Sequence, residues 1–355
     1  MSSGIFTRMG DGERIVVDEA EVRKELLDGT QDAAKKGKIP ELEQSDLDQL
    51  FEIIAEPGRI VSVPHGEELI ATDDGIANNL HASEADGGAG IPMDSLSCVL
   101  AYERGTAADT AGVGHEDYSF KPVKAVIDSQ MESYYTSSMS VTIPLIYGSQ
   151  PNLGLYFQPD GPFPNASELL PLGKIDEARK AQEDAAVAAK EDMVFVGKKM
   201  YEMGCEGFNF DTAGSSGDAD LYATLEATRE LKESCPNMYV IIGMASEFVL
   251  GMHGKIEFDG QRLAGMFPHK QVKVCEDAGA DIFGVAVNTN TSKTVPWNLA
   301  KAVTFVKNTV EEANIPVHPN VGMGVCGIPM MVETPIDCVT RTAKALRLVG
   351  NADGL

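Results

Sequence analysis

The fold is decided by the stretch from residue 207 to residue 247, which reads GFNFDTAGSSGDADLYATLEATRELKESCPNMYVIIGMASE. Its first apolar segment, Phe208–Asp211, predicts a strand, and its last, Tyr239–Ala245, predicts a buried strand. Between them, Asp218–Ser234 repeats apolar side chains at the spacing of an amphipathic helix. A strand, a helix and a strand in this order predict a parallel βαβ unit.

The same alternation continues on both sides of this stretch. The other predicted segments are strands at Thr142–Tyr147, Ile282–Val287 and Pro316–Val321, and helices at Ile175–Met203, Pro268–Ala278, Pro296–Ala313 and Pro335–Val349, the last with Thr334 as its N-cap. No strand opens into a nucleotide-binding turn. The pattern therefore predicts an α/β fold of the (β/α)8 TIM-barrel type rather than a doubly wound sheet.

The two ends of the chain depart from this alternation. Residues 1–120 are rich in Gly and acids, with one clear helical pattern at Ser45–Ile54, and we expect an irregular N-terminal elaboration packed on the barrel. Residues 121–355 are expected to form most of the barrel. Because Val349-Gly-Asn-Ala-Asp-Gly-Leu355 resembles the earlier exits from helix into strand, we expect the barrel to be incomplete at its C-terminus; a frayed tail is the alternative.

Composition narrows the class of protein. The 355 residues are 43% hydrophobic, with 29 basic and 54 acidic side chains and a net charge of -25. Such a surface repels nucleic acid and anionic membranes but is compatible with a cationic substrate. Residues Met1–Arg14 show no export signal, Ser133–Pro159 is interrupted by Pro and Gly, and the six cysteines include no C-x-x-C. We therefore expect a cytoplasmic protein with reduced thiols.

Two glycine-rich motifs predict loops rather than cofactor sites. Gly322-Met-Gly-Val-Cys-Gly327 has dinucleotide-binding spacing, but Pro329 prevents the helix that such a site needs. The loop Gly214–Gly217 resembles a phosphate cradle, but Asp218 and Asp220 in the next helical turn favour a helix cap. The six histidines lack zinc spacing, so no metal site is expected.

Polar side chains follow the predicted strands. Because a barrel places its chemistry at the carboxyl ends of its strands, we expect these residues to share one mouth. Asp211 and Glu247 are the catalytic candidates, on position alone. The candidates for substrate binding are Thr212, His253, Asn288, Asn290, His318 and Asn320. A hairpin around Asp259-Gly260 is predicted on the same face.

Several long strings carry a family resemblance. They are His115-Glu-Asp-Tyr-Ser-Phe-Lys-Pro-Val-Lys124, Asn152-Leu-Gly-Leu-Tyr-Phe-Gln-Pro-Asp-Gly-Pro-Phe163, Gly207-Phe-Asn-Phe-Asp-Thr212, Gly251-Met-His-Gly254, Phe267-Pro-His-Lys-Gln-Val272 and Asn288-Thr-Asn-Thr-Ser-Lys293. Together they resemble dimethylamine:corrinoid methyltransferases, over nearly the whole chain.

The resemblance implies a barrel enzyme that transfers a methyl group from dimethylamine to cobalt, in methanogenesis or methylamine use. The corrinoid is carried by a cognate partner protein, so no cofactor is bound directly. The family also implies a pyrrolysine immediately after a segment resembling Ala352-Asp-Gly-Leu355, so we expect the chain as written to be inactive. Its electrophilic imine carbon would hold the amine, while an acid and a base, for which Asp211 and Glu247 are the candidates, would move protons. A homo-oligomer is expected.

Two alternatives remain open. A related barrel enzyme acting on another methylated amine would show similar motifs, because one methyl group changes affinity little. A truncated barrel that only docks a corrinoid protein, without catalysis, is the alternative from a different class.

Overall fold

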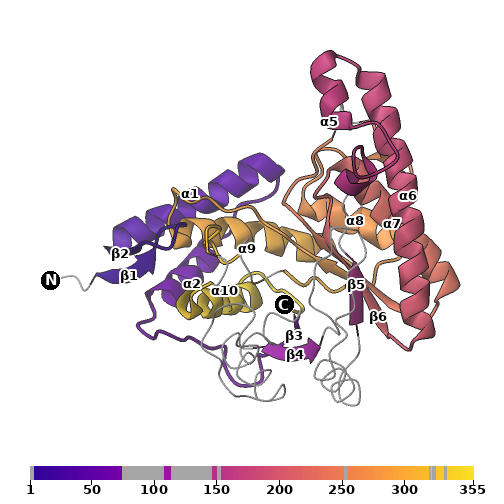
Figure 1. The fold of residues 1–355 in the computed structure, drawn as a ribbon. Coiled ribbons are helices and arrows are strands. Elements are labelled where there is room, and N and C mark those ends of the chain that lie inside the picture. The colour runs from indigo at the N-terminus through magenta and orange to yellow at the C-terminus, as the bar shows by residue number, and fades with distance from the viewer. Residues whose placement is uncertain are drawn as a thin grey trace, which may run out of the picture. The chain divides into compact units, whose positions relative to one another are not determined.

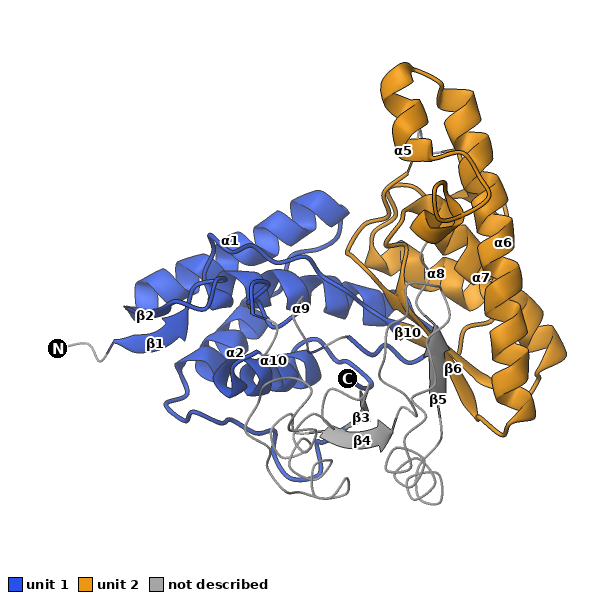
Figure 2. Cartoon of the chain, viewed as in Figure 1, with its two compact units in different colours: residues 1–111, 284–355 blue, residues 112–283 orange. Residues whose placement is uncertain are grey.

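The computed structural model describes residues 4–73, 108–112, 146–149, 153–251, 255–319, 321, 325–331 and 334–355 (Figure 1). The chain forms two compact units (Figure 2). Unit 1 combines residues 1–111 with 284–355, and unit 2 contains residues 112–283. The predicted boundary near residue 120 lies outside the described residues.

Unit 2 is built on a sheet whose strand order is β10-β7-β6-β5. The strands are β5 (Ile146–Ser149), β6 (Gly207–Ala213), β7 (Tyr239–Met244) and β10 (Ile282–Gly284). β6 pairs in parallel with both β5 and β7. The predicted α/β class with a parallel sheet is therefore confirmed.

Three helices accompany this sheet: α6 (Ile175–Glu202), α7 (Asp218–Ser234) and α8 (Pro268–Ala278). α6 and α7 approach closely, since a Cβ on Gly197 would lie 2.7 Å from a methyl carbon of Leu231. The rings of Phe208 and Phe210, both fully buried on β6, meet edge to face with centroids 5.1 Å apart. The predicted helices of this unit thus form, but β10 ends at Gly284 rather than at the predicted Val287, and residues 142–145 of the first predicted strand lie outside the described residues.

Shorter elements fill the connections of unit 2. After β5 come the 3-10 helix η2 (Leu153–Tyr156), α5 (Ala166–Leu169) and the 3-10 helix η3 (Leu170–Leu172). Between β7 and α8, β8 (Glu257–Phe258) and β9 (Gln261–Arg262) form the predicted hairpin. Asp259 and Gly260 have φ values of 49° and 77°, as a two-residue turn of this kind requires.

Unit 1 joins both ends of the chain. The N-terminal part contributes the antiparallel strands β1 (Ile5–Arg8) and β2 (Arg14–Val17), then α1 (Glu19–Gly37) and α2 (Gln44–Ala55). The C-terminal part contributes α9 (Val295–Glu312) and α10 (Ile336–Leu348). A small sheet pairs β3 (Leu69–Asp73) with β4 (Ala108–Gly112).

Close approach of α1 to α9 holds the two parts of unit 1 together. A Cβ on Gly29 would lie 2.2 Å from the carbonyl oxygen of Trp297, so only glycine fits there. The hydroxyls of Thr30 and Thr304 form a buried hydrogen bond of 2.9 Å. Small side chains thus let the helix backbones meet.

Buried arginines add a second connection in unit 1. Arg8 donates to both carboxylate oxygens of Asp337, from Nε at 2.8 Å and from Nη2 at 2.9 Å. Arg341 donates to the carbonyl oxygens of Glu56 at 2.5 Å and Gly58 at 2.8 Å, just beyond α2. The last helix is therefore bonded to two N-terminal segments.

Three sequence predictions in unit 1 need correction. The N-terminal region is not irregular over residues 4–73, because it forms β1, β2 and the unpredicted α1. The described residues of the predicted strand Pro316–Val321, which exclude residue 320, form no strand: Val317 makes a single β-bridge, and Pro319 has no N–H to donate to a ladder. α10 begins one residue late, with Pro335 rather than Thr334 as its N-cap.

The sequence predicted no membrane-spanning segment and reduced thiols. None of the helices in the described ranges is long and apolar enough to cross a membrane. The five described cysteines are free and buried, and Cys98 lies outside the described residues. Burial raises the pKa of the Cys326 thiol to about 12, so this thiol stays protonated and unreactive at neutral pH.

Candidate functional site

The carboxyl end of β6 is irregular where the candidate catalytic residue Asp211 lies. β6 and β7 pair in regular register up to Phe210, but β6 uses one extra residue before pairing resumes at Ala213. Within this β-bulge, Thr212 has a φ of 55°, a left-handed conformation that strains a β-branched residue. Bulges and strained residues cluster at functional sites, so this strand end is a candidate site.

The side chains of the bulge lie close to β7. Asp211 is half-buried, and a Cβ on Gly243 of β7 would lie 3.7 Å from Asp211 Oδ1. The buried Oγ1 of Thr212 has no hydrogen-bond partner among the described residues. A buried unsatisfied hydroxyl costs about 1–3 kcal/mol, so this group is available to a ligand.

Glu247 lies at the corresponding end of β7. It follows the strand by three residues, and only 4% of it is exposed. The N–H of Ala245 donates to the carbonyl of Ala213 at 2.9 Å, which keeps the two strand ends together. Asp211 and Glu247 therefore leave adjacent parallel strands at the same end, as the sequence predicted; their catalytic roles stay predictions.

Asp220, which the sequence did not single out as a site residue, fills the loop between β6 and α7. Its side chain is fully buried, and Oδ2 accepts hydrogen bonds from the Ser216 N–H at 2.9 Å and the Ser215 hydroxyl at 3.1 Å. Burial raises the pKa of Asp220 to about 6, although these hydrogen bonds oppose the rise. The loop thus binds a carboxylate of the chain itself, but this is not the predicted helix cap, because the N-cap of α7 is Gly217 and no side chain makes a capping hydrogen bond there.

His318, in unit 1, is packed against the backbone of Gly354. A Cβ on Gly354 would lie 2.2 Å from His318 Nε2, so a larger residue does not fit there. Burial lowers the pKa of His318 to about 4, and the charge of Asp353 only partly opposes this. The imidazole is therefore neutral at neutral pH, and its buried Nδ1 has no hydrogen-bond partner among the described residues.

The other candidates for substrate binding follow β10 or lie outside the described residues. Asn288 is exposed, and its carbonyl accepts a hydrogen bond from Lys301 Nζ at 2.6 Å. Asn290 Oδ1 accepts from the N–H and the hydroxyl of Ser292, both at 2.8 Å, so this oxygen is used within the loop. His253 and Asn320 lie outside the described residues. The structure thus brings Asp211, Thr212 and Glu247 together in unit 2, whereas Asn288, Asn290 and His318 belong to unit 1.

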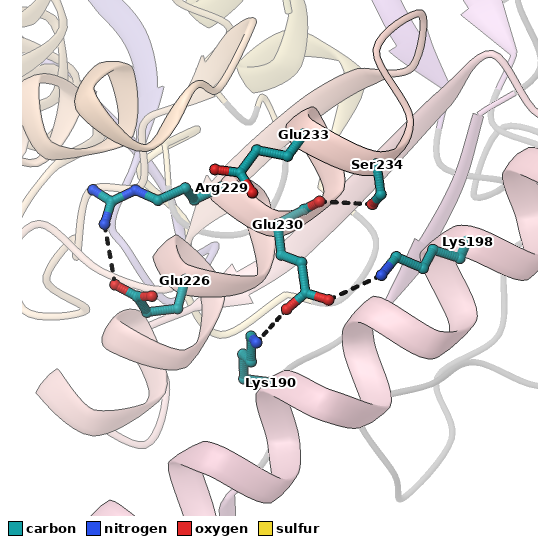
Figure 3. A pocket seen from close by; sticks show the side chains of 7 residues that line it. All are labelled: Lys190, Lys198, Glu226, Arg229, Glu230, Glu233 and Ser234. Carbon is teal, nitrogen blue, oxygen red and sulfur yellow. Dashed lines mark hydrogen bonds and ion pairs between the residues drawn. The ribbon is translucent and has the colours of Figure 1, made fainter.

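An open pocket between α6 and α7 has charges that are already paired. Figure 3 shows Glu230 between Lys190 and Lys198, with an ion pair to each. Arg229, which also lines the pocket, pairs with Glu226 at 3.4 Å. The pocket residues of α7 belong to its C-terminal half, which leads to the amino end of β7. This pocket therefore does not belong to the strand-end site.

The described ranges offer no cluster of side chains that could bind a metal ion. They contain no group of three or more His, Cys, Asp or Glu side chains close enough to hold an ion. The expectation of a site without bound metal stays a prediction.

Comparisons with known proteins include a family match over nearly the whole chain. The family model for dimethylamine methyltransferases matches residues 3–355. Among solved structures, the apo form of the homocysteine methyltransferase MmuM from Escherichia coli is similar, at 13% identity and a TM-score of 0.31. That alignment covers 83% of this chain and 99% of the other chain, and a likeness this distant carries no weight here.

Proposed function

The chain belongs to the dimethylamine methyltransferase family, and on that basis we propose that it transfers a methyl group from dimethylamine to the cobalt of a separate corrinoid protein. We place this reaction at the carboxyl ends of β6 and β7 because of the strained bulge at Asp211 and Thr212, beside Glu247. The proposal thus joins a family activity to one end of the parallel sheet.

We extend the sheet to a (β/α) barrel. The strand order β5, β6, β7, β10 follows the order of the chain, with at least one helix in each of the three connections. A barrel has this sequential order, whereas a doubly wound sheet reverses its order at a switch point.

The side chains suit a small cationic amine. Dimethylamine carries a proton at neutral pH and must lose it before nitrogen can act as a nucleophile. A carboxylate at the strand ends can bind the cation and accept that proton, for which Asp211 and Glu247 are the candidates. The Thr212 hydroxyl can orient the nitrogen, and the net charge of -25 favours the approach of a cation.

The corrinoid supplies the methyl acceptor when the partner protein is docked. The residues of this chain have a different task, which is to bind the amine, remove its proton and hold its methyl carbon in one position. Orientation of this kind is a large part of catalysis, because correctly placed groups react as if at very high concentration.

The test is methyl transfer with the purified gene product, made in a host that inserts pyrrolysine. Reduced cognate corrinoid protein and dimethylamine are added, and cobalt methylation is followed by absorbance. We expect Asp211→Asn or Glu247→Gln to lower kcat/KM by about 10²–10⁴-fold, the usual contribution of a general acid or base. Glu191→Gln, on an exposed part of α6, is the matched control and should change little.

Three outcomes would contradict this proposal. Full activity in both site variants would remove the carboxylates from the mechanism. Faster transfer from another methylated amine would point to the related enzyme. A complex with the corrinoid protein but no transfer would point to a docking module.

A further inference from the structure

Asn298, a buried residue in the first turn of α9, binds the backbone of two loops. Its side chain is fully buried. Oδ1 accepts from the Asn290 N–H at 2.9 Å, while Nδ2 donates to the carbonyls of Asn290 at 2.9 Å and Gly327 at 2.8 Å. Both N–H groups and the oxygen of one carboxamide are therefore used.

The sequence placed candidate residues in the first of these loops and just before the second. The first follows β10 and carries Asn288 and Asn290. The second follows His318 and contains Gly327, which has a φ of 78°. A Cβ on Gly327 would lie 2.9 Å from the Cβ of Asn298, so this loop is in close contact with the helix.

The first loop is also held from two other segments of unit 1. The N–H of Gly10, in the turn after β1, donates to the carbonyl of Lys293 at 2.7 Å. A Cβ on Gly10 would lie 2.2 Å from the Asn290 carbonyl oxygen, so the turn and the loop touch backbone to backbone. Lys301, 4% exposed on α9, donates to the Asn288 carbonyl at 2.6 Å. Buried groups thus fix this loop at three points, namely Asn288, Asn290 and Lys293.

We infer that Asn298 is a positioning residue for methyl transfer, which acts by holding the Asn288–Ser292 loop and the Gly327 loop in one arrangement. This inference rests on the proposed function and on Asn288 as a substrate-binding residue predicted from the sequence. A carboxamide is needed because the site requires two donors and one acceptor. Asp at this position would keep the acceptor but turn a negative charge towards two carbonyl oxygens.

The test compares Asn298→Asp with Asn308→Asp. Asn308 lies on the same helix, is 7% exposed, and donates to the carbonyls of Pro40 at 3.3 Å and Thr304 at 2.8 Å, which belong to neither loop. Both variants should lower the melting temperature by similar amounts. Only Asn298→Asp should lower kcat, by about 10–100-fold with KM changed less than about threefold, since small misplacements are costly in catalysis.

A second measurement separates this inference from the proposed function. Hydrogen exchange of peptides covering residues 285–294 should become faster in Asn298→Asp and not in Asn308→Asp, whether or not the protein transfers methyl groups. If wild type is inactive but exchange behaves in this way, the loop clamp stands and the proposed function fails. If wild type is active and both variants lose activity equally, Asn298 is only structural and the inference is overturned.

Gly10→Ala tests the same loop if Asn298→Asp does not fold. The added Cβ would push against the Asn290 carbonyl, so kcat should fall as in Asn298→Asp. Gly37→Ala is the control, because its Cβ would lie 2.8 Å from a ring carbon of Phe305, away from both loops. Equal activity in Gly10→Ala and wild type would overturn the inference.

Discussion

The two units of this protein are assembled from different kinds of contact. Unit 2 is built mainly from neighbouring segments, as strand β6, helix α7 and strand β7 follow one another along the chain. Unit 1 joins segments from opposite ends, with Arg8 bonded to Asp337 and Thr30 bonded to Thr304. When a substitution removes one side chain of a long-range polar pair, the buried partner is left without its hydrogen bond. A contact between segments adjacent in the chain is supported by many other contacts around it. We therefore expect unit 1 to be the more sensitive to single substitutions at its polar connections.

The largest expected effect is that of Arg8→Ala in unit 1. Removing one member of a buried ion pair leaves Asp337 charged and buried, which costs about 3–5 kcal/mol. Urea denaturation should show this loss in the free energy of unfolding. Hydrogen exchange should become faster in peptides from residues 4–60 and 284–355, while the β6–α7 peptides change little. Equally faster hydrogen exchange in both units would contradict the expected difference in their sensitivity.

Asp220→Asn, in unit 2, should raise the free energy of unfolding rather than lower it. The pKa of Asp220 is raised from 3.8 to about 6, so the folded state binds more protons than the unfolded state between these values. Wild type therefore loses stability as the pH rises through this window, and the variant does not. At pH 8 we expect the variant to be more stable by about 1–3 kcal/mol, with a smaller difference near pH 4. A variant less stable than wild type at pH 8 would show that the loop needs the charge.

His318→Gln, in unit 1, should change stability less than Asp220→Asn does. Its pH dependence is the reverse, because the effect of His318 is seen as the pH falls. The pKa of His318 is lowered from 6.5 to about 4, so the unfolded state binds more protons in this window. Wild type loses stability as the pH falls from 6.5 towards 4, and the variant should lose less. Melting temperatures at pH 7.5 and pH 4.5 measure this difference. Parallel curves for the two proteins would mean that His318 is accessible to protons in the folded state.

The smallest effect is expected for Lys232→Ala in unit 2. Lys232 Nζ lies 2.8 Å from Asp281 Oδ2, but the two side chains are 26% and 31% exposed. Partly exposed pairs contribute about 0–1 kcal/mol, so the melting temperature should hardly change. A loss as large as that of Arg8→Ala would show that unit 2 also depends on single polar connections.

The same contrast explains which elements could be predicted from sequence. α7 and α8 have the predicted bounds, because regular spacing of apolar side chains and the capping residues act locally. α1 was missed because its buried face consists largely of small residues, with Gly29, Thr30 and Ala33 packed close to α9. A pattern search for large apolar side chains does not detect a helix of this kind.

The candidate site was predictable to a similar degree. Asp211 and Glu247 were located from the rule that chemistry follows the carboxyl ends of parallel strands. The bulge at Thr212 and the raised pKa of Asp220 were not predictable, because the bulge depends on the pairing of β6 with β7 and the pKa depends on burial by the folded protein. The backbone contacts of Asn298 likewise join positions too far apart in sequence for any local pattern.

The pairing of Arg8 with Asp337 also sets an order of events during synthesis. The ribosome makes Arg8 329 residues before its partner. At usual rates of about 5–20 residues per second, Asp337, which pairs with the charge of Arg8, is made roughly 15–65 s after the hairpin of β1 and β2. All of unit 2 emerges during this interval, and we expect its peptides to resist protease on stalled ribosomes before those of residues 4–60 do. We thus expect residues 4–60 to be made before unit 2 but to fold after it.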